Sequence, residues 1–194
     1  MIDLIFETNG QGQPERILLA ASECISTRGY ANVSMRDIAK EAGVVLSQLN
    51  YYFKNKEGLF KEVVRMMMDK YLREIEEALK EEDSPKERVK SLVKYFRKML
   101  HYNPKLFRLL YEFTGLAIWS PVFRDLLRNL FNDLSDMIEM YILKNSQLKK
   151  LKGYSSKSLS RLIIGSMFGT GIQALLYHDE ELTEALDAIQ ILLD

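Results

Sequence analysis

Apolar residues recur along most of this chain at intervals of three and four positions, which is the spacing of one face of an α-helix. Alternating runs of β-branched residues, which would predict strands, are nearly absent. The pattern predicts helices over residues 14–28, 34–42, 46–52, 56–82, 86–102, from 104, 121–145, 156–177 and 181–193. We therefore predict an all-α protein of about nine helices.

Local signals support the boundaries of these helices. Each of the four prolines stands where a helix can begin. Ser34, followed three residues later by Asp37, matches a capping box, and Asn55 is a second predicted N-cap. Gly29 and Gly43 are predicted to end the first two helices. The first helix should bury a stripe made of Ile17, Ala20, Ala21, Cys24 and Ile25.

The second and third predicted helices have the pattern of a helix-turn-helix. Ala39 is small enough for a steep helix crossing, and Gly43 suits the tight turn. Ile38, Val44 and Leu49 are spaced to face inward. The second helix of such a motif can enter the major groove of DNA. The same spacing also fits a plain helical hairpin inside a bundle.

Cationic and aromatic residues follow this motif directly. Lys56 falls in the first turn of a long predicted helix, where the helix dipole disfavours a cation by about 0.3–1 kcal/mol. A phosphate at that place would reverse the sign, because it would attract both the lysine and the helix terminus. Tyr51, Tyr52 and Lys54 lie close by in the sequence. Each charge alone is typical of a solvated surface, but the set on one small unit favours a phosphate-binding surface.

Composition limits where a positive surface can be. The chain has 27 Lys and Arg against 27 Asp and Glu, and residues 1–60 hold six against seven. Any basic footprint must therefore be local, which predicts modest non-specific affinity for DNA and a shallow dependence on salt. Cys24 is the single cysteine, so no internal disulfide forms, as is typical of the cytoplasm. The apolar run 162–177 is shorter than a membrane-spanning helix of about 20 residues, so we expect a soluble protein that binds no membrane.

Residues 14–64 resemble the DNA-binding domain of the tetracycline-repressor (TetR) family. The similarity lies in Arg28-Gly29-Tyr30, Ser34 to Ala39, Ala42-Gly43-Val44, Leu49, and the run YFKNKE over 52–57. The resemblance implies a flexible leader at 1–13, a helix-turn-helix DNA-binding domain at 14–55, and a ligand-sensing and dimerisation domain at 56–194. It also implies a homodimer, a palindromic double-stranded operator and a small-molecule effector.

Carried over position by position, the resemblance and the local pattern predict the DNA contacts. The candidates are Ser34, Arg36, Leu46, Ser47, Gln48, Tyr51, Tyr52, Lys54 and Lys56. Gln48 is the candidate base reader, with adenine as the expected match. Val45 and Leu46 depart from the family, which usually has polar residues there, and Asn50 replaces an aromatic residue. Two readings of these departures are open: the helix begins later, with Ser47 as its cap, or Leu46 contacts a thymine methyl group.

Two further sets of residues are candidates for dimerisation and for effector binding. The predicted dimer interface is a small and apolar face made of Leu162, Gly165, Gly169, Ile172, Leu176, Leu186 and Ile189. The predicted effector pocket is lined by Met67, Tyr71, Tyr95, Met99, Phe107, Tyr111, Trp119, Met137 and Phe168. Both sets also fit a solid intramolecular core. His101 and His178 lie far apart with no acid or thiol cluster, so we expect no metal site and no cofactor.

The sequence therefore predicts a regulator that binds DNA, most simply a repressor released from its operator by a small hydrophobic molecule. A helical protein–protein interaction module that keeps the fold without binding DNA is the alternative. A small helical enzyme is a third reading, but no nucleophile–base pair, phosphate loop or pair of carboxylates is evident, so we expect no enzyme activity.

Overall fold

The computed structural model describes residues 12–144, 153–177 and 184–193. Within these ranges it contains eight α-helices, a π-helical segment, a 3-10 helix and no strand, which confirms the all-α prediction. Residues 1–11 of the predicted leader lie outside the described residues. The elements are α1 (Gln13–Arg28), α2 (Met35–Glu41), α3 (Leu46–Tyr52), α4 (Lys56–Lys80), α5 (Pro85–Tyr102), α6 (Pro104–Trp119), α7 (Pro121–Ile138), η1 (Glu139–Leu143), α8 (Ser156–Tyr177) and η3 (Ala185–Leu193).

The predicted signals for helix ends are confirmed. Ser34 and Asp37 form the reciprocal capping box of α2, in which the Ser34 hydroxyl accepts from the Asp37 amide and the Asp37 carboxylate accepts from the Ser34 amide. The side-chain Oδ1 of Asn55 accepts from the Gly58 amide at 2.7 Å and so caps α4. Gly29 ends α1 at a φ of 81°, where a side chain would be strained. Local chemistry alone therefore bounds the first helices.

The seventh and last predicted helices differ from their prediction. α7 ends at Ile138, and the chain continues as the π-helical segment η1 rather than as α-helix to residue 145. Within η1 the Tyr141 carbonyl accepts from Arg88 Nη1 at 2.8 Å, and an inserted side chain is a known cause of such interruptions. The last helix is a 3-10 helix over Ala185–Leu193, and residues 181–183 of its prediction lie outside the described residues.

The chain packs as two units. The N-terminal unit contains the residues up to Met68 together with Lys105–Arg124, and the C-terminal unit contains Asp69–Pro104 and the residues from Asp125 onward. Helix α4 begins in the first unit and ends in the second. The helix-turn-helix therefore packs with α6 as well as with its neighbours in sequence.

An aromatic cluster forms the centre of the N-terminal unit. Phe60 on α4, Phe113 on α6 and Phe123 on α7 are almost fully buried, and the Phe60 and Phe123 ring centroids lie 5.5 Å apart. Tyr30, just after α1, joins them at 5.1 Å from the Phe60 centroid. The predicted stripe of α1 is buried as well. This cluster explains why residues 105–124 belong to the same unit as the first three helices.

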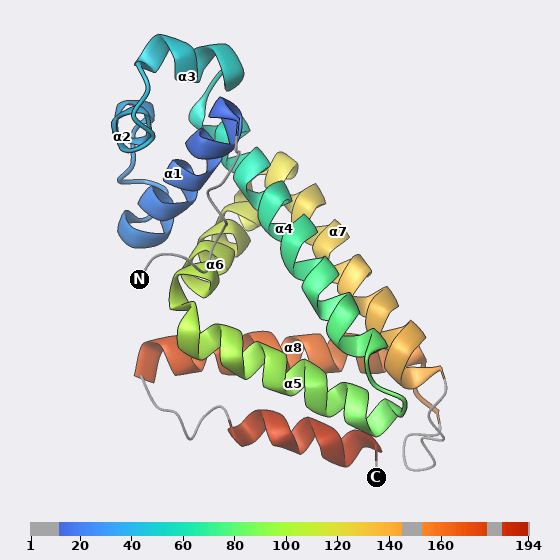
Figure 1. Ribbon diagram of the computed structural model, residues 1–194. Helices are drawn as coiled ribbons and strands as arrows, with labels where there is room; N and C mark the ends of the chain where they lie inside the picture. The colour runs from blue at the N-terminus through green and yellow to red at the C-terminus, as the bar shows by residue number, and fades with distance from the viewer. Residues whose placement is uncertain (1–11, 145–152, 178–183, 194) are drawn as a thin grey trace. The chain divides into compact units, whose positions relative to one another are not determined.

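The C-terminal unit is held together by apolar packing and by a buried pair of hydroxyls. Ser135 on α7 and Ser160 on α8 share a hydrogen bond of 2.5 Å, and the rings of Phe131 and Phe168 lie 5.2 Å apart. The 3-10 helix η3 packs against both α5 and α8, as Figure 1 shows in the lower part of the view. Leu186 lies in this interior and is 1% exposed.

Helix α8 is apolar on all sides, which distinguishes it from the other long helices. Its buried face includes Leu159, Ile163 and Met167, whereas Leu162 and Leu176 on the opposite face are exposed. The helix has 22 residues, and its length and composition suffice to cross a membrane. A single such helix is equally typical of a soluble protein, so this feature does not indicate a membrane protein.

Candidate nucleic-acid interface

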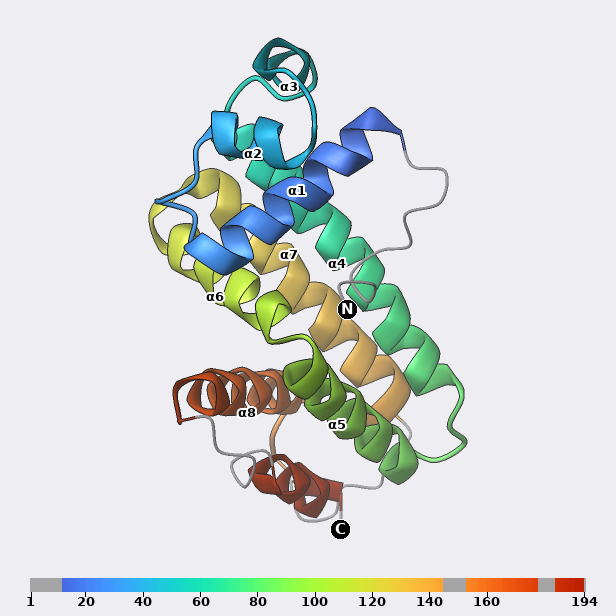
Figure 2. The same ribbon diagram turned by 60° about the vertical axis from the view of Figure 1, so that its left-hand side comes forward.

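Helices α2 and α3 cross steeply at the helix-turn-helix. Figure 1 shows α2 nearly end-on and α3 from the side, and Figure 2 shows α3 nearly end-on. Gly43 between them has a φ of 64°, and the Val44 amide donates to the Ala39 carbonyl at 3.0 Å. Ile38, Ala39 and Leu49 are buried, and Val44 is half-buried. The turn therefore has the geometry that the sequence predicted.

Arg16 on α1 adds a contact that the sequence did not signal. Its Nη2 donates to the Ala42 carbonyl at 3.0 Å, so the guanidinium satisfies a backbone acceptor at the end of α2. A contact between residues that are 26 positions apart leaves no periodic mark in a sequence. It fixes α1 against the turn, and the turn sets the direction of α3.

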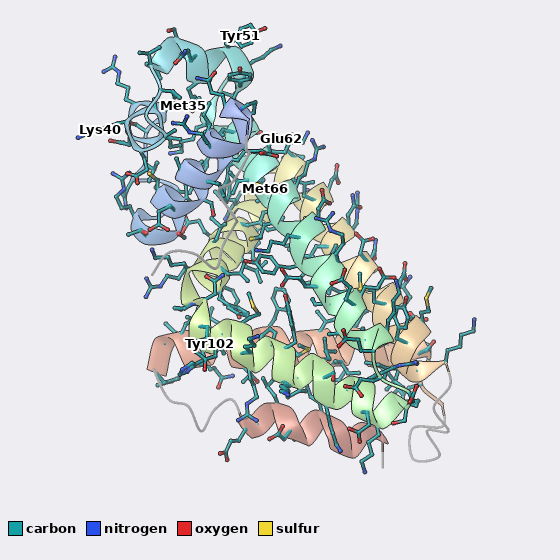
Figure 3. All side chains as sticks on the ribbon, in the orientation of Figure 1. Met35, Lys40, Tyr51, Glu62, Met66 and Tyr102 are labelled. Atoms are coloured by element: carbon teal, nitrogen blue, oxygen red, sulfur yellow. The ribbon has the colours of Figure 1, made fainter. Side chains whose placement is uncertain are left out.

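Helix α3 buries one side and exposes the other. Leu49 is completely buried, whereas Ser47, Gln48 and Tyr51 are exposed, with 84% of Tyr51 accessible. Leu46 is half-buried. Figure 3 shows Tyr51 on the outer side of α3 and Lys40 extending outward from α2. The exposed side of α3 is thus free of packing within the unit and is polar or aromatic.

The bounds of α3 agree with the prediction of a helix over 46–52, and the alternative of a later start is wrong. The helix begins at Leu46 with Val45 as its N-cap, and Val45 has no side-chain oxygen to accept a backbone N–H. Gln48 compensates from inside the helix, because its side-chain oxygen accepts from the Val45 amide at 3.2 Å. Ser47 is therefore a residue of the first turn rather than the cap. Gln48 holds the helix start and also has the position of the predicted base reader.

The start of α2 presents an arginine beside its capping box. Arg36 is exposed, and Ser34 is exposed with its hydroxyl donating to Asp37 Oδ2 at 2.5 Å. The hydrogen bonds from Ser34 hold the pKa of the Asp37 carboxyl below its usual value, and Arg28 and Lys40 act in the same direction. The cap is thus complete without DNA.

The residues at the end of α3 and after it make more contacts within the protein than their sequence suggests. Tyr52 is 39% exposed, and its hydroxyl donates to the side-chain oxygen of Gln13 on α1 at 3.2 Å. The rings of Tyr51 and Tyr52 meet edge to face with centroids 5.2 Å apart. Lys54 is exposed. A phosphate contact by Tyr52 would have to share or replace its bond to Gln13.

Lys56 is half-buried, and its ammonium is directed into the unit. Its Nζ donates to the Val33 carbonyl at 2.7 Å and lies 4.3 Å from the centroid of the Tyr30 ring. Burial lowers the pKa of this lysine, and the nearby Glu112 carboxylate opposes that shift. The sequence predicts that Lys56 binds an anion at the start of α4. The structure instead shows its ammonium satisfying the carbonyl that precedes the α2 cap.

The residues of the predicted effector pocket divide between the two units. Met67, Phe107, Tyr111 and Trp119 belong to the N-terminal unit, and Trp119 is 84% exposed. The remaining members, which belong to the C-terminal unit, are Tyr71, Tyr95, Met99, Met137 and Phe168.

Two of these members carry a polar network that the apolar spacing did not predict. The Asn103 amide donates to the Tyr71 hydroxyl at 3.2 Å, and the Tyr95 hydroxyl donates to Glu74 at 2.6 Å. Burial raises the pKa of Tyr71 to about 12, and burial together with the bond to Glu74 raises that of Tyr95 further.

The residues of the predicted dimer interface also separate into two groups. Leu162, Ile172 and Leu176 are 53%, 41% and 70% exposed, and a Cβ built at Gly165 or Gly169 would meet no atom within 4 Å. Leu186 and Ile189 are buried inside the C-terminal unit, which leaves them almost no surface to offer a partner. An exposed strip therefore remains on α8 alone.

Comparison with known proteins agrees with this geometry. Residues 17–63, which include α1, α2 and α3, match the family model described as bacterial regulatory proteins, tetR family. Residues 17–63 therefore form a tetR-family domain. It is 35% identical over 74 residues to the fatty acid metabolism regulator protein of Bacillus subtilis, a match that covers 38% of each chain. The chain spans less than half the length of the first curated relatives that it matches.

Solved structures of regulators share the fold over almost the whole chain. A TetR transcription regulator from Haloarcula marismortui matches with a TM-score of 0.82 at 21% identity, over 94% of this chain and 96% of that one. The fatty acid degradation regulator FadR from Bacillus halodurans matches with a TM-score of 0.75 at 22% identity, over 96% and 97% of the two chains. These likenesses show that the fold is shared beyond the matched residues.

Proposed function

We propose that this tetR-family protein is a cytoplasmic transcription regulator that binds DNA through α3. The observation that carries the proposal is the two-sided α3, in which buried Leu49 anchors the helix and Gln48 and Tyr51 are presented to solvent. A helix presented in this way has the dimensions of the major groove. Arg36 and Lys54 are exposed beside it and supply cations for the phosphate backbone. Lys56, at the start of α4, contacts a further phosphate when its ammonium turns outward.

The protein acts as a homodimer in this proposal. A single helix of seven residues reads only a few base pairs, and a two-fold dimer reads two half-sites about 34–36 Å apart. The exposed strip of α8 supplies the apolar surface that such a dimer needs. The open positions at Gly165 and Gly169 allow a second helix to approach closely. The operator is accordingly a palindrome.

The protein is further proposed to be a repressor that a small hydrophobic molecule releases from its operator. The C-terminal unit offers large apolar side chains, and the polar network of Tyr71, Tyr95, Glu74 and Asn103 can recognise a hydrogen-bonding end. The name of the Bacillus subtilis relative points to a fatty-acid derivative as the first compound to test. Helix α4 carries Lys56 and Tyr71, so a ligand that prefers one arrangement of this helix changes DNA affinity by about 1–3 kcal/mol.

Selection of bound sequences from a random pool of duplex DNA tests the proposed function. We expect a palindromic consensus for the wild-type chain and no enrichment for Gln48→Ala combined with Arg36→Ala. Circular dichroism of the variant shows whether it is folded. A folded wild-type chain that enriches no sequence would contradict DNA binding and favour the protein–protein interaction module instead.

The effector is tested separately by isothermal titration of long-chain fatty acids and their thioesters. The titration is run with and without the selected operator. A repressor of this kind binds the compound more weakly in the presence of DNA, because the two equilibria are linked. Equal affinities in both conditions would contradict induction and leave DNA binding untouched.

A further inference from the structure

The Glu112 carboxylate on helix α6 contacts the segment between α1 and α2. The Tyr30 amide donates to Glu112 Oε1 at 2.9 Å, and this contact joins residues 82 positions apart. The carboxylate is half-buried, and a Cβ built at Gly29 would lie 3.7 Å from its Oε2. A side chain at this position would be in ordinary contact with the carboxylate, so it is the φ of 81° that favours glycine here.

Tyr30 connects this carboxylate to Lys56. Its amide is bound by Glu112, and its ring lies under the Lys56 ammonium at 4.3 Å. The same ammonium donates to the Val33 carbonyl at 2.7 Å. Three groups thus favour the inward position of a lysine that the proposed function places beside DNA: a carbonyl, an aromatic face and the negative charge of Glu112.

An ion pair between α1 and α6 fixes α6 independently of Lys56. Lys105, in the first turn of α6, pairs with Glu23 on α1. Phe113, next to Glu112, is completely buried in the aromatic cluster. The position of the Glu112 carboxylate is therefore set by packing and by the Lys105–Glu23 pair. Removal of its charge should leave α6 in place.

We propose that Glu112 is a positioning residue that restrains Lys56, holding its ammonium on Tyr30 and Val33 and so lowering the affinity of the protein for the DNA backbone. The inference rests on the proposed function, in which Lys56 contacts a phosphate. To do so, the ammonium has to weaken its contacts in the unit and move away from the carboxylate. The charge on α6 then sets how readily the start of α4 engages DNA.

The Glu112→Gln variant tests this restraint, because an amide oxygen can still accept from the Tyr30 amide while the negative charge is lost. We expect operator affinity to rise by about three- to tenfold, the effect of one modest charge interaction in each protomer. The slope of affinity against salt concentration should not change, because the number of phosphate contacts is the same. Thermal unfolding of the variant provides the control for folding.

A double-mutant cycle separates the restraint from simple repulsion between Glu112 and DNA. In a Lys56→Gln background, Glu112→Gln should produce no gain in affinity, because there is no ammonium to release. Glu41→Gln serves as the matched control, since it removes the same charge from an exposed residue of α2. Any gain from Glu41→Gln should persist in the Lys56→Gln background. A gain from Glu112→Gln that also persists in the Lys56→Gln background overturns the inference. An unchanged or lower operator affinity of Glu112→Gln in the wild-type background overturns it as well.

A second measurement needs no DNA and distinguishes failure of this inference from failure of the proposed function. Acetylation of lysine amines in the free protein, followed by mass spectrometry, should label Lys56 more slowly than exposed Lys54. Glu112→Gln should speed labelling of Lys56 by about threefold and leave Lys54 unchanged. Equal labelling of Lys56 in both proteins overturns the restraint. If the restraint holds in this assay but the wild-type chain enriches no DNA sequence, only the proposed function fails.

Discussion

The two units of the molecule expose opposite kinds of surface. In the N-terminal unit the outer sides of α2 and α3 carry Arg36, Gln48 and Tyr51, while the large aliphatic residue of α3 is buried. In the C-terminal unit α8 exposes Leu162 and Leu176 along one side. A polar and cationic surface suits a polyanion, whereas an apolar strip is stable in water only when a second apolar surface covers it. The side chains exposed on α2 and α3 and those exposed on α8 therefore suit different kinds of partner.

Disruption of the apolar strip should have the largest effect on DNA binding. Leu162→Glu combined with Leu176→Glu places charges in the proposed dimer contact, so the chain should become monomeric. Because two linked half-site contacts become one, operator affinity should fall by about 10²–10⁴-fold. Analytical ultracentrifugation and a gel shift measure the two quantities.

Lys98→Glu on α5 is the control for this prediction. It alters the net charge by the same two units at an exposed position outside the strip. This variant should remain dimeric and bind the operator. A double glutamate variant that stays dimeric would show that α8 is not the interface.

Removal of the anchor of α3 should come next in magnitude. Leu49 is completely buried, so Leu49→Ala should lower the free energy of unfolding of the N-terminal unit by about 2–5 kcal/mol. The exposed neighbour Ser47→Ala should change it by less than about 0.5 kcal/mol. Urea denaturation followed by circular dichroism compares the two variants. Equal effects would mean that α3 is not anchored as the structure shows.

A smaller effect is expected from the candidate base reader. Gln48→Ala should cost about 1–3 kcal/mol of operator binding and relax the preference at one base pair in each half-site. Lys54→Gln, a phosphate contact in the proposal, should instead weaken binding to all sequences and lower the salt slope by about one for each half-site. Binding measured against a set of mutated operators at several salt concentrations distinguishes the two. A uniform loss with Gln48→Ala would remove Gln48 from base recognition.

The smallest predicted effect concerns the interior of the C-terminal unit at alkaline pH. Burial raises the pKa of Tyr71 to about 12, whereas the pKa of a tyrosine in an unfolded chain is about 10. The folded state therefore holds its proton while the unfolded state loses one, and the resulting stability is complete below pH ~10 and is lost as the pH rises towards 12.

Tyr71→Phe tests the titration of this buried hydroxyl. It should reduce the fall in stability above pH 10, after a cost of about 1 kcal/mol at neutral pH for the lost bond from Asn103. Urea unfolding at neutral pH measures the cost, and a series from about pH 9 to 11 measures the fall in stability. Tyr177→Phe, at an exposed position, should change neither quantity. An unchanged pH dependence in Tyr71→Phe would contradict the proposed burial of this hydroxyl.

Features set by neighbouring residues were the ones that could be predicted from sequence. The capping box of Ser34 and Asp37, the turn at Gly43 and the bounds of α3 all depend on side chains and backbone within a few positions. Only the alternative of a later start for α3, with Ser47 as the cap, was wrong. No local rule favours Val45 as a cap, and the Gln48 side chain that stabilises the first turn was assigned another role.

Features set by distant residues could not be predicted. Lys56 was expected to face an anion, and its inward position depends on Tyr30, Val33 and a carboxylate on α6. Leu186 and Leu176 have the same apolar character in sequence, yet η3 buries the first and α8 exposes the second. Periodicity shows that a residue lies on the apolar side of a helix. It does not show which other surface covers that side.

The sequence by itself determined that this chain is helical, where most helices begin and end, and that residues 14–64 resemble a DNA-binding domain. These properties arise from short-range sterics, hydrogen bonds and spacing. Only the tertiary structure decided that α6 belongs to the N-terminal unit, that Lys56 points inward and that α8 keeps an apolar side exposed. Those outcomes depend on contacts between residues that are far apart in the chain, whose free energies appear only when the helices pack.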